Sequence, residues 1–228
     1  MARTLTVDRD RTAAFDVDAQ NTFTPLCPDE LPVAGGTEIV PELNAQARLA
    51  AVRVGSKDAH SPEAIWVADE RQAPFSRIEG YANADIAWPV HAVPGTKGFE
   101  LIAGLPPVTA YDYFVWKGVE PDIHPYGACY HDLAEQLSTG VIEFLRARGI
   151  DTVLVGGLAT DYCVKHTALQ LKRAGFRVVL NLAAVRGVAP DTTAAAIEEM
   201  RRAGVEFVDN AGALRNAAPE SRHDHQPA

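Results

Sequence analysis

Short apolar runs alternate along the chain with segments in which apolar side chains recur at helical spacing. The apolar runs predict strands, which cover residues 12–17, 52–56, 111–116, 152–157, 178–184 and 205–209. The helical spacing predicts helices, which cover residues 37–51, 140–149, 161–174 and 191–204. Near-continuous apolar strands that alternate with helices are typical of a parallel sheet covered on both faces. The pattern therefore predicts an α/β protein with a three-layer, doubly wound fold around a mainly parallel central sheet.

Residues 59–98 interrupt this pattern. They lose all periodicity and contain several prolines and glycines, and long irregular segments inside compact domains usually carry function. A chain of 228 residues most simply forms one domain. We expect that domain to cover residues 1–210, with 59–98 as an active-site loop. The polar end of the chain, residues 211–228, is expected to be a flexible tail.

Composition and charge narrow the classes of partner. The sequence has 30 acidic residues against 21 lysines and arginines, for a net charge of −9, whereas proteins that neutralise nucleic-acid phosphates need a basic surplus. No stretch approaches the roughly 20 apolar residues of a membrane-spanning helix, and the N-terminus is charged rather than apolar. The 3 cysteines are too few and too unevenly spaced for a disulfide framework. We therefore expect a cytoplasmic protein that binds neither nucleic acid nor a membrane.

Reactive side chains lie just past the ends of three predicted strands, and they are Asp18, Lys117 and Cys163. In open α/β sheets, ligands bind at the carboxyl edge of the strands, so these side chains are expected to converge there. Asp18 would take the thiol proton, and Lys117 would favour the charged forms of both neighbours. Because the thiolate is the reactive form of cysteine, the arrangement predicts a nucleophilic site. Asp16, slightly earlier in the same strand, is the alternative carboxylate.

Cys163 also falls in the first turn of its predicted helix. Thr160 or Asp161 would cap that helix, and the helix dipole would then lower the pKa of the thiol further. The alternative is that Cys163 is a small buried apolar residue, which is the commoner role of a lone cysteine. Cys27 and Cys129 are expected to have a structural role or none. From the spacing alone, both interpretations of Cys163 stay open.

Several short segments carry a more specific signal when they are taken together and in order. They are DAQNTF at 18–23, KDAH at 57–60, WPVHAVPGT at 88–96, WKG at 116–118 and GGLATDYCV at 156–164. With this combination the chain resembles the nicotinamidase and pyrazinamidase branch of the isochorismatase-like cysteine hydrolases, which have a Rossmann-like fold. The resemblance implies a catalytic triad of Asp18, Lys117 and Cys163. It also implies a cis peptide bond between Leu158 and Ala159, and an oxyanion hole formed by the backbone N–H groups of Ala159 and Cys163.

The same resemblance implies one bound divalent metal ion. Its ligands would be Asp58 and His60 from the KDAH segment and His91 from the WPVHAVPGT segment. Carboxylate and imidazole ligands suit zinc, which we expect first, and also iron or manganese. Some members of the family supply a fourth protein ligand from the loop between these motifs, but this loop contains no histidine between His60 and His91. The candidates left for that position are Glu63, Asp69, Glu70 and water.

The activity implied by the resemblance is hydrolysis of nicotinamide to nicotinate and ammonia through a cysteine thioester, a step of NAD salvage. Pyrazinamide would be a further substrate. The metal would hold the pyridine nitrogen and so place the carboxamide against Cys163, where a small misalignment is costly. The aromatic side chains that would wall the ring are Phe23, Trp88, Tyr126 and Tyr162. Aromatic residues are also common in protein cores, so each of them has a purely structural alternative.

Other functions on this fold stay open at this stage. A relative of N-carbamoylsarcosine amidase or ureidoacrylate hydrolase would share the triad but would not need the site at Asp58, His60 and His91. A catalytically silent binding protein would keep the fold without the activity. Because symmetric homo-oligomers are common among soluble proteins, self-association is also an expectation.

Overall fold

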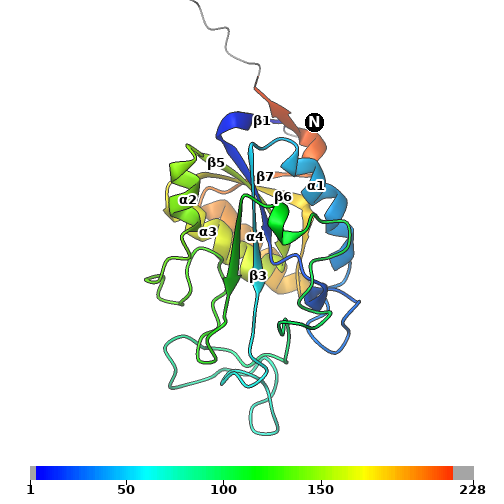
Figure 1. The fold of residues 1–228 in the computed structure, drawn as a ribbon, viewed down its shortest axis with the longest axis vertical. Coiled ribbons are helices and arrows are strands. Elements are labelled where there is room, and N and C mark those ends of the chain that lie inside the picture. Colours follow the sequence, from blue (N-terminus) through cyan, green and yellow to red (C-terminus); the bar gives the residue numbers. More distant parts are fainter. Residues whose placement is uncertain (1–3, 218–228) are drawn as a thin grey trace, which may run out of the picture.

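A six-stranded sheet runs through the centre of the protein in the order β4-β3-β2-β5-β6-β7 (Figure 1). The computed structural model describes residues 4–217. The strands are β2 (Thr12–Val17), β3 (Val52–Asp58), β4 (Tyr113–Lys117), β5 (Thr152–Leu158), β6 (Arg177–Arg186) and β7 (Glu206–Val208). All neighbouring strands of this sheet are parallel. The predicted α/β fold with a parallel central sheet is therefore confirmed.

Helices cover both faces of the sheet. They are α1 (Val40–Ala47), α2 (Val141–Ala147), α3 (Lys165–Arg173) and α4 (Pro190–Arg202). Apolar side chains of α2, α3 and α4 share one buried cluster with Phe15 of β2 and Val155 of β5. On the other side of the sheet, α1 packs in a second cluster with parts of the long loop that follows β3 (Figure 1). The arrangement has the three layers that the sequence predicts.

Strand β5 shows why its sequence reads as a continuous apolar run. Val153 and Val155 pack in the cluster with α2, α3 and α4, whereas Leu154 between them packs with Val179 in a separate cluster. Every residue of β5 is buried. Because a central parallel strand is covered on both faces, it cannot show the alternation of a half-exposed strand.

The first predicted helix differs from the observed one at both ends. A 3₁₀ turn over Gly36–Ile39 precedes α1, and α1 ends at Ala47 rather than at residue 51. Ala51 cannot continue the helix, because its backbone N–H donates to the carbonyl oxygens of Arg9 and Thr12 near the start of β2.

The expectation of a flexible tail from residue 211 is wrong for residues 211–216. A 3₁₀ turn covers Ala211–Ala213, and strand β8 (Leu214–Asn216) pairs in parallel with an N-terminal strand, β1 (Leu5–Val7), which the sequence pattern did not reveal. Leu5, Val7 and Leu214 are buried together against the central sheet. The two short strands thus cover apolar surface that would otherwise meet water. Residues 218–228 lie outside the described part of the chain.

The long excursion predicted at 59–98 is irregular in the structure as well, and the irregular path continues to a short 3₁₀ turn at Val108–Ala110. Its beginning lies beyond the carboxyl ends of the strands. Strands β2 and β5 are neighbours in the sheet, but the chain continues from β2 to β3 on one side and from β5 to β6 on the other. A crevice at such a switch point is the usual ligand site of open α/β sheets.

Gly157, in β5, is required at its position. Its φ is +131°, a value that favours glycine, and an added Cβ would lie 1.9 Å from the carbonyl oxygen of Val17. We expect Gly157→Ala to lower the free energy of unfolding by at least about 3 kcal/mol, because backbone strain and a clash with backbone add together. Gly175→Ala is the matched control, since Gly175 also has a positive φ of +93° but open space around it. That variant should lose only about 1 to 2 kcal/mol in urea denaturation, and equal losses would contradict the clash.

Candidate active site

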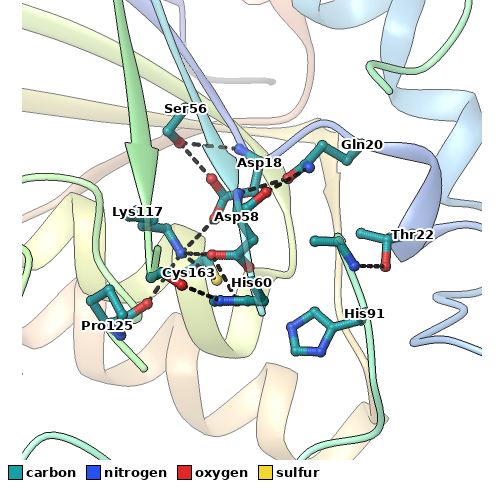
Figure 2. Close-up of polar contacts among 12 residues, drawn as sticks. Asp18, Gln20, Thr22, Ser56, Asp58, His60, His91, Lys117, Pro125 and Cys163 are labelled. Atoms are coloured by element: carbon teal, nitrogen blue, oxygen red, sulfur yellow. Dashed lines mark hydrogen bonds and ion pairs between the residues drawn. The ribbon is translucent and has the colours of Figure 1, made fainter. Parts of the chain in front are cut away.

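The candidate triad lies at the carboxyl ends of three strands of the central sheet. Asp18 directly follows β2, Lys117 is the last residue of β4, and Cys163 lies in the turn after β5. Figure 2 shows the three side chains pointing toward one another, with Asp58 from the end of β3 beside them. The structure therefore brings together the residues that the strand-end argument selected.

Lys117 is the charged centre of this group. It is fully buried, and its Nζ lies 3.1 Å from Asp18 Oδ2 and in contact with Asp58 Oδ1. The Nζ also donates to the carbonyl oxygen of Pro125 at 3.1 Å and lies 3.7 Å from Cys163 Sγ. Burial disfavours the ammonium, but the carboxylates of Asp18 and Asp58 outweigh it and raise the pKa of Lys117 well above its usual range. The lysine is therefore held as a cation.

Asp18 is held by its neighbours in one orientation. Its backbone has a φ of +43°, a left-handed conformation that aspartate tolerates better than most residues. Its N–H donates to Ser56 Oγ at 3.2 Å, and the Ser56 hydroxyl donates back to Asp18 Oδ1 at 2.6 Å. Burial raises the pKa of this carboxyl group, while the charge of Lys117 opposes the shift. Asp18 is thus a better proton acceptor than an exposed aspartate.

Cys163 is the nucleophile candidate and is only 5% exposed. Its Sγ, one carboxylate oxygen of Asp18 and one of Asp58 lie within 4.8 Å of one another. Burial raises the pKa of the thiol well above its usual range, against the effect of Lys117, and the two carboxylates add to the rise. The expectation of a thiol pKa lowered at a helix end is therefore wrong for this arrangement. A thiol with a raised pKa keeps its proton unless a neighbouring base removes it, and a carboxylate oxygen of Asp18 lies within 4.8 Å of the sulfur.

The segment before Cys163 also differs from the prediction. Residues Thr160–Val164 form a π-helical turn that leads into α3, and neither Thr160 nor Asp161 caps it. Asp161 instead accepts hydrogen bonds from the backbone N–H groups of Val188 and Ala189, which begin the approach to α4. The peptide bond between Leu158 and Ala159 is cis, as the resemblance implies.

The histidines expected to bind metal lie next to the triad. His60 Nδ1 is 3.0 Å from the Gly118 carbonyl oxygen, and His91 Nδ1 is 2.7 Å from the Pro89 carbonyl oxygen. An Nδ1–H that donates to a carbonyl leaves Nε2 free to bind a metal, which is the usual outer-shell arrangement of metal-ligating histidines. His60 Nε2 is buried, has no hydrogen-bond partner among residues 4–217, and lies 3.4 Å from Asp58 Oδ1.

Gln20 fixes the backbone at this point. Its side-chain amide donates to the carbonyl oxygen of Asp58 at 2.9 Å and accepts from the N–H of Asp58 at 2.8 Å. Burial disfavours a charged Asp58, but Lys117 and His60 outweigh it and lower the pKa of the carboxyl group. Burial also lowers the pKa of His91 to about 3, so its imidazole is neutral and able to act as a ligand.

A further histidine, His124, joins this group and was missed by the sequence analysis. One imidazole nitrogen from each of His60, His91 and His124 lies within 4.8 Å of the other two, and all three residues are buried. Of the candidates for a fourth ligand, Glu63, Asp69 and Glu70 have exposed side chains and are not members of this group, whereas water stays a prediction. His124 comes from the loop after β4, where no motif marks it.

An aromatic pocket opens beside the thiol. Phe23, Trp88, Tyr126 and Tyr162 all line it together with Cys163 and His91. The Trp88 and Tyr162 rings meet edge to face with centroids 4.9 Å apart, and the Tyr126 hydroxyl donates to Asp85 Oδ1 at 2.7 Å. The arrangement suits a flat aromatic ring that carries a reactive group toward the sulfur.

Asp16 and the remaining cysteines lie outside this arrangement. Asp16 Oδ2 accepts from Arg53 at 2.6 Å and from the Tyr111 hydroxyl at 2.9 Å, so the alternative carboxylate serves an ion pair instead. Cys27 and Cys129 are free and buried.

No helix within residues 4–217 combines the length and apolar character needed to cross a bilayer.

The chain is similar in sequence to known proteins. The isochorismatase domain family matches residues 12–212. A nicotinamidase from Acinetobacter baylyi is 34% identical over 178 residues, which are 77% of this chain and 81% of the relative.

Solved structures show the same similarity. A nicotinamidase/pyrazinamidase from Acinetobacter baumanii superposes with a TM-score of 0.81 at 31% identity, over 89% of this chain and 97% of that one. The pyrazinamidase of Pyrococcus horikoshii in complex with zinc gives a TM-score of 0.70 at 31% identity, over 87% and 98% of the two chains. The fold, the converging strand-end residues and these matches together show that the chain belongs to the isochorismatase family.

Proposed function

We propose that this protein is a nicotinamidase that hydrolyses nicotinamide to nicotinate and ammonia and also accepts pyrazinamide. The observation that carries the proposal is one pocket in which an aromatic wall, a buried thiol and a histidine cluster meet. The relatives named above, nicotinamidases and pyrazinamidases, support the same substrate class. A heteroaromatic carboxamide matches each part of this pocket.

The donor set fits a divalent metal ion. Within the described part of the chain, His60 Nε2 is a buried nitrogen without a hydrogen-bond partner. Asp58, with its lowered carboxyl pKa, supplies a carboxylate next to it. Asp58, His60 and His91 would hold the ion, with zinc as the first candidate, iron and manganese as the others. The zinc in the similar Pyrococcus horikoshii pyrazinamidase supports this assignment. When bound, the metal would hold the pyridine nitrogen and so fix the position of the carboxamide.

The first half of the reaction would form a thioester. Cys163 gives its proton to Asp18 as the sulfur attacks the carboxamide carbon, and the backbone N–H groups of Ala159 and Cys163 stabilise the oxyanion. Asp18 then returns the proton to the nitrogen, the C–N bond breaks and ammonia leaves. The raised pKa of the buried Asp18 suits a group that must both accept and return a proton.

The second half would release the acid. Asp18 takes a proton from water, the hydroxide attacks the thioester carbon, and Cys163 leaves as the thiolate and recovers its proton from Asp18. Lys117 remains charged throughout, 3.1 Å from Asp18 and 3.7 Å from the sulfur. Its role is to stabilise the thiolate and the carboxylate whenever either is charged.

The ring would be bound by Phe23, Trp88, Tyr126 and Tyr162, whose side chains line the pocket. Amidohydrolases of the same fold that act on non-aromatic amides would need neither this wall nor the histidine cluster. Self-association and a cytoplasmic location stay predictions.

The test is ammonia release from nicotinamide and pyrazinamide, with metal-replete protein compared with protein stripped by a chelator. We expect stripping to lower kcat/KM by about 100-fold or more, because loss of the positioning group misplaces the carboxamide, and zinc should restore it. Circular dichroism of the stripped protein controls for unfolding. Absence of ammonia from intact, metal-replete protein would reject the nicotinamidase proposal, and full activity after verified stripping would reject the metal's role.

A further inference from the structure

We propose that His124 is an additional protein ligand of the metal, supplied by the loop after β4 and not by the loop between His60 and His91. This inference rests on the metal site of the proposed function. The proposal is based first on the geometry: one ring nitrogen from each of His60, His91 and His124 lies within 4.8 Å of the other two. Nitrogens at such separations need only small side-chain movements to meet around one ion of about 2.0 to 2.1 Å Zn–N distance.

The second observation is that, among the described residues, neither ring nitrogen of His124 has a hydrogen-bond partner. It is only 4% exposed, and both Nδ1 and Nε2 are buried without a hydrogen bond in the described structure. A neutral imidazole has one N–H donor and one unprotonated acceptor nitrogen. The unprotonated nitrogen of His124 therefore lies buried without a hydrogen-bond donor. Buried polar atoms left unpaired are uncommon and point to a missing ion or water. A metal ion shared with His60 and His91 supplies that partner.

The ring is held in place by its neighbours. It stacks on the Trp88 ring with centroids 5.6 Å apart and an interplanar angle of 11°, and on the His60 ring at 5.0 Å and 21°. The edge of Trp66 meets it at 4.5 Å and 77°. Such packing fixes an imidazole in one orientation, which is the preorganisation that a metal ligand needs.

The backbone around His124 is fixed as well. Its N–H donates to the carbonyl oxygen of Asn83 at 2.7 Å, which ties the loop after β4 to the long loop that carries His91. The next residue, Pro125, gives its carbonyl oxygen to Lys117 Nζ at 3.1 Å. The loop is therefore anchored at His124 to the long loop that carries His91, and at Pro125 to Lys117 of the triad.

The inference changes the expected ligand set to one carboxylate and three imidazoles, from Asp58, His60, His91 and His124. A nitrogen-rich set favours zinc and other imidazole-preferring transition ions over magnesium or calcium. It also leaves the exposed acidic residues Glu63, Asp69 and Glu70 without a role at the metal.

The test counts imidazoles around zinc directly. X-ray absorption of the zinc-loaded, full-length protein should give three imidazoles for the wild type and two for His124→Phe, which keeps a ring against Trp88 but has no donor nitrogen. Competition with a chelator should show at least about 10-fold weaker zinc binding in His124→Phe, since loss even of an outer-shell partner costs about 10- to 100-fold. His124→Cys should recover part of the affinity, because a thiolate also binds zinc.

His131 is in the same loop but outside the cluster, so His131→Phe is the matched control and should bind zinc as the wild type does. The melting temperature of each metal-free variant checks its folding, and the zinc-induced rise should be smaller in His124→Phe alone. Two imidazoles in the wild type, or unchanged zinc affinity in His124→Phe, would overturn the inference while leaving the nicotinamidase proposal intact. A wild type that binds no zinc, iron or manganese would overturn both the inference and the metal's role in the proposed function.

Discussion

Replacing Cys163 with alanine is expected to lower kcat for nicotinamide hydrolysis by at least about 10,000-fold, because removal of a covalent nucleophile leaves only binding and oxyanion stabilisation. The thiol lies in the aromatic pocket, 3.7 Å from Lys117 Nζ and within 4.8 Å of the Asp18 carboxylate. No other cysteine lines that pocket within the described residues. Ammonia release under saturating substrate measures the loss.

Cys129→Ala is the matched control for that variant. Cys129 is also a free, buried cysteine, and burial raises the pKa of its thiol, but it lies in the hydrophobic core and not in the pocket. Its activity should stay within about twofold of the wild type. Acid quenching during turnover, followed by intact-mass measurement, should show a nicotinoyl adduct in the wild type and none in Cys163→Ala. Activity within about tenfold of the wild type in Cys163→Ala would contradict the covalent mechanism.

The strand-end residues show which part of the site the sequence could predict. Asp18, Lys117 and Cys163 each follow a short apolar run, and parallel strands bring their carboxyl ends to one edge of the sheet. Local periodicity was therefore enough to bring these three together before any geometry was known. The candidate metal ligands His60 and His91 and the aromatic Trp88 needed the family motifs, because the long loop after β3 that carries them has no periodicity.

His124 and Ser56 show what the sequence could not predict. Nothing in the local sequence separates His124 from His131, which lies in the same loop; only the packing of that loop against Trp88 and Asn83 makes the difference. Ser56 is one of two small residues in a mostly buried strand. Its role comes from the alignment of β3 beside β2, which places its hydroxyl 2.6 Å from Asp18 Oδ1.

Asp161 shows how a tertiary partner can override a local rule. Its place before a helical segment predicts a cap, since aspartate is a preferred N-cap residue. The side chain instead satisfies the backbone N–H groups of Val188 and Ala189, and the hydroxyl of Thr192 donates to it at 2.5 Å. Asp161 therefore binds the segment that leads into α4, a helix later in the chain, and not the start of its own helix. Sequence spacing alone carries no information about such a contact.

Replacing Lys117 with methionine is expected to lower the free energy of unfolding of the metal-free protein by about 3 to 5 kcal/mol, the usual cost of removing one partner of a buried ion pair. Methionine keeps the length of the side chain but not its charge. Asp18 and Asp58 would then be buried anions without a cation, since Lys117 Nζ contacts both. Urea denaturation measures the change. Lys165→Met is the control, because its ion pair with Glu199 is half-exposed and should contribute less than about 1 kcal/mol.

The pH dependence of the Lys117→Met variant separates charge from packing. Without the ammonium, burial should raise the pKa of both carboxyl groups above their unfolded values of about 3.9. A raised folded-state pKa favours the folded protein at low pH and destabilises it as the pH rises. The deficit relative to wild type should therefore be largest near neutral pH and shrink toward about pH 4. Asp18→Asn in the Lys117→Met background should recover part of the stability at neutral pH. A deficit that is independent of pH and unchanged by Asp18→Asn would show that Lys117 acts by filling space, and the electrostatic account of the triad would then fail.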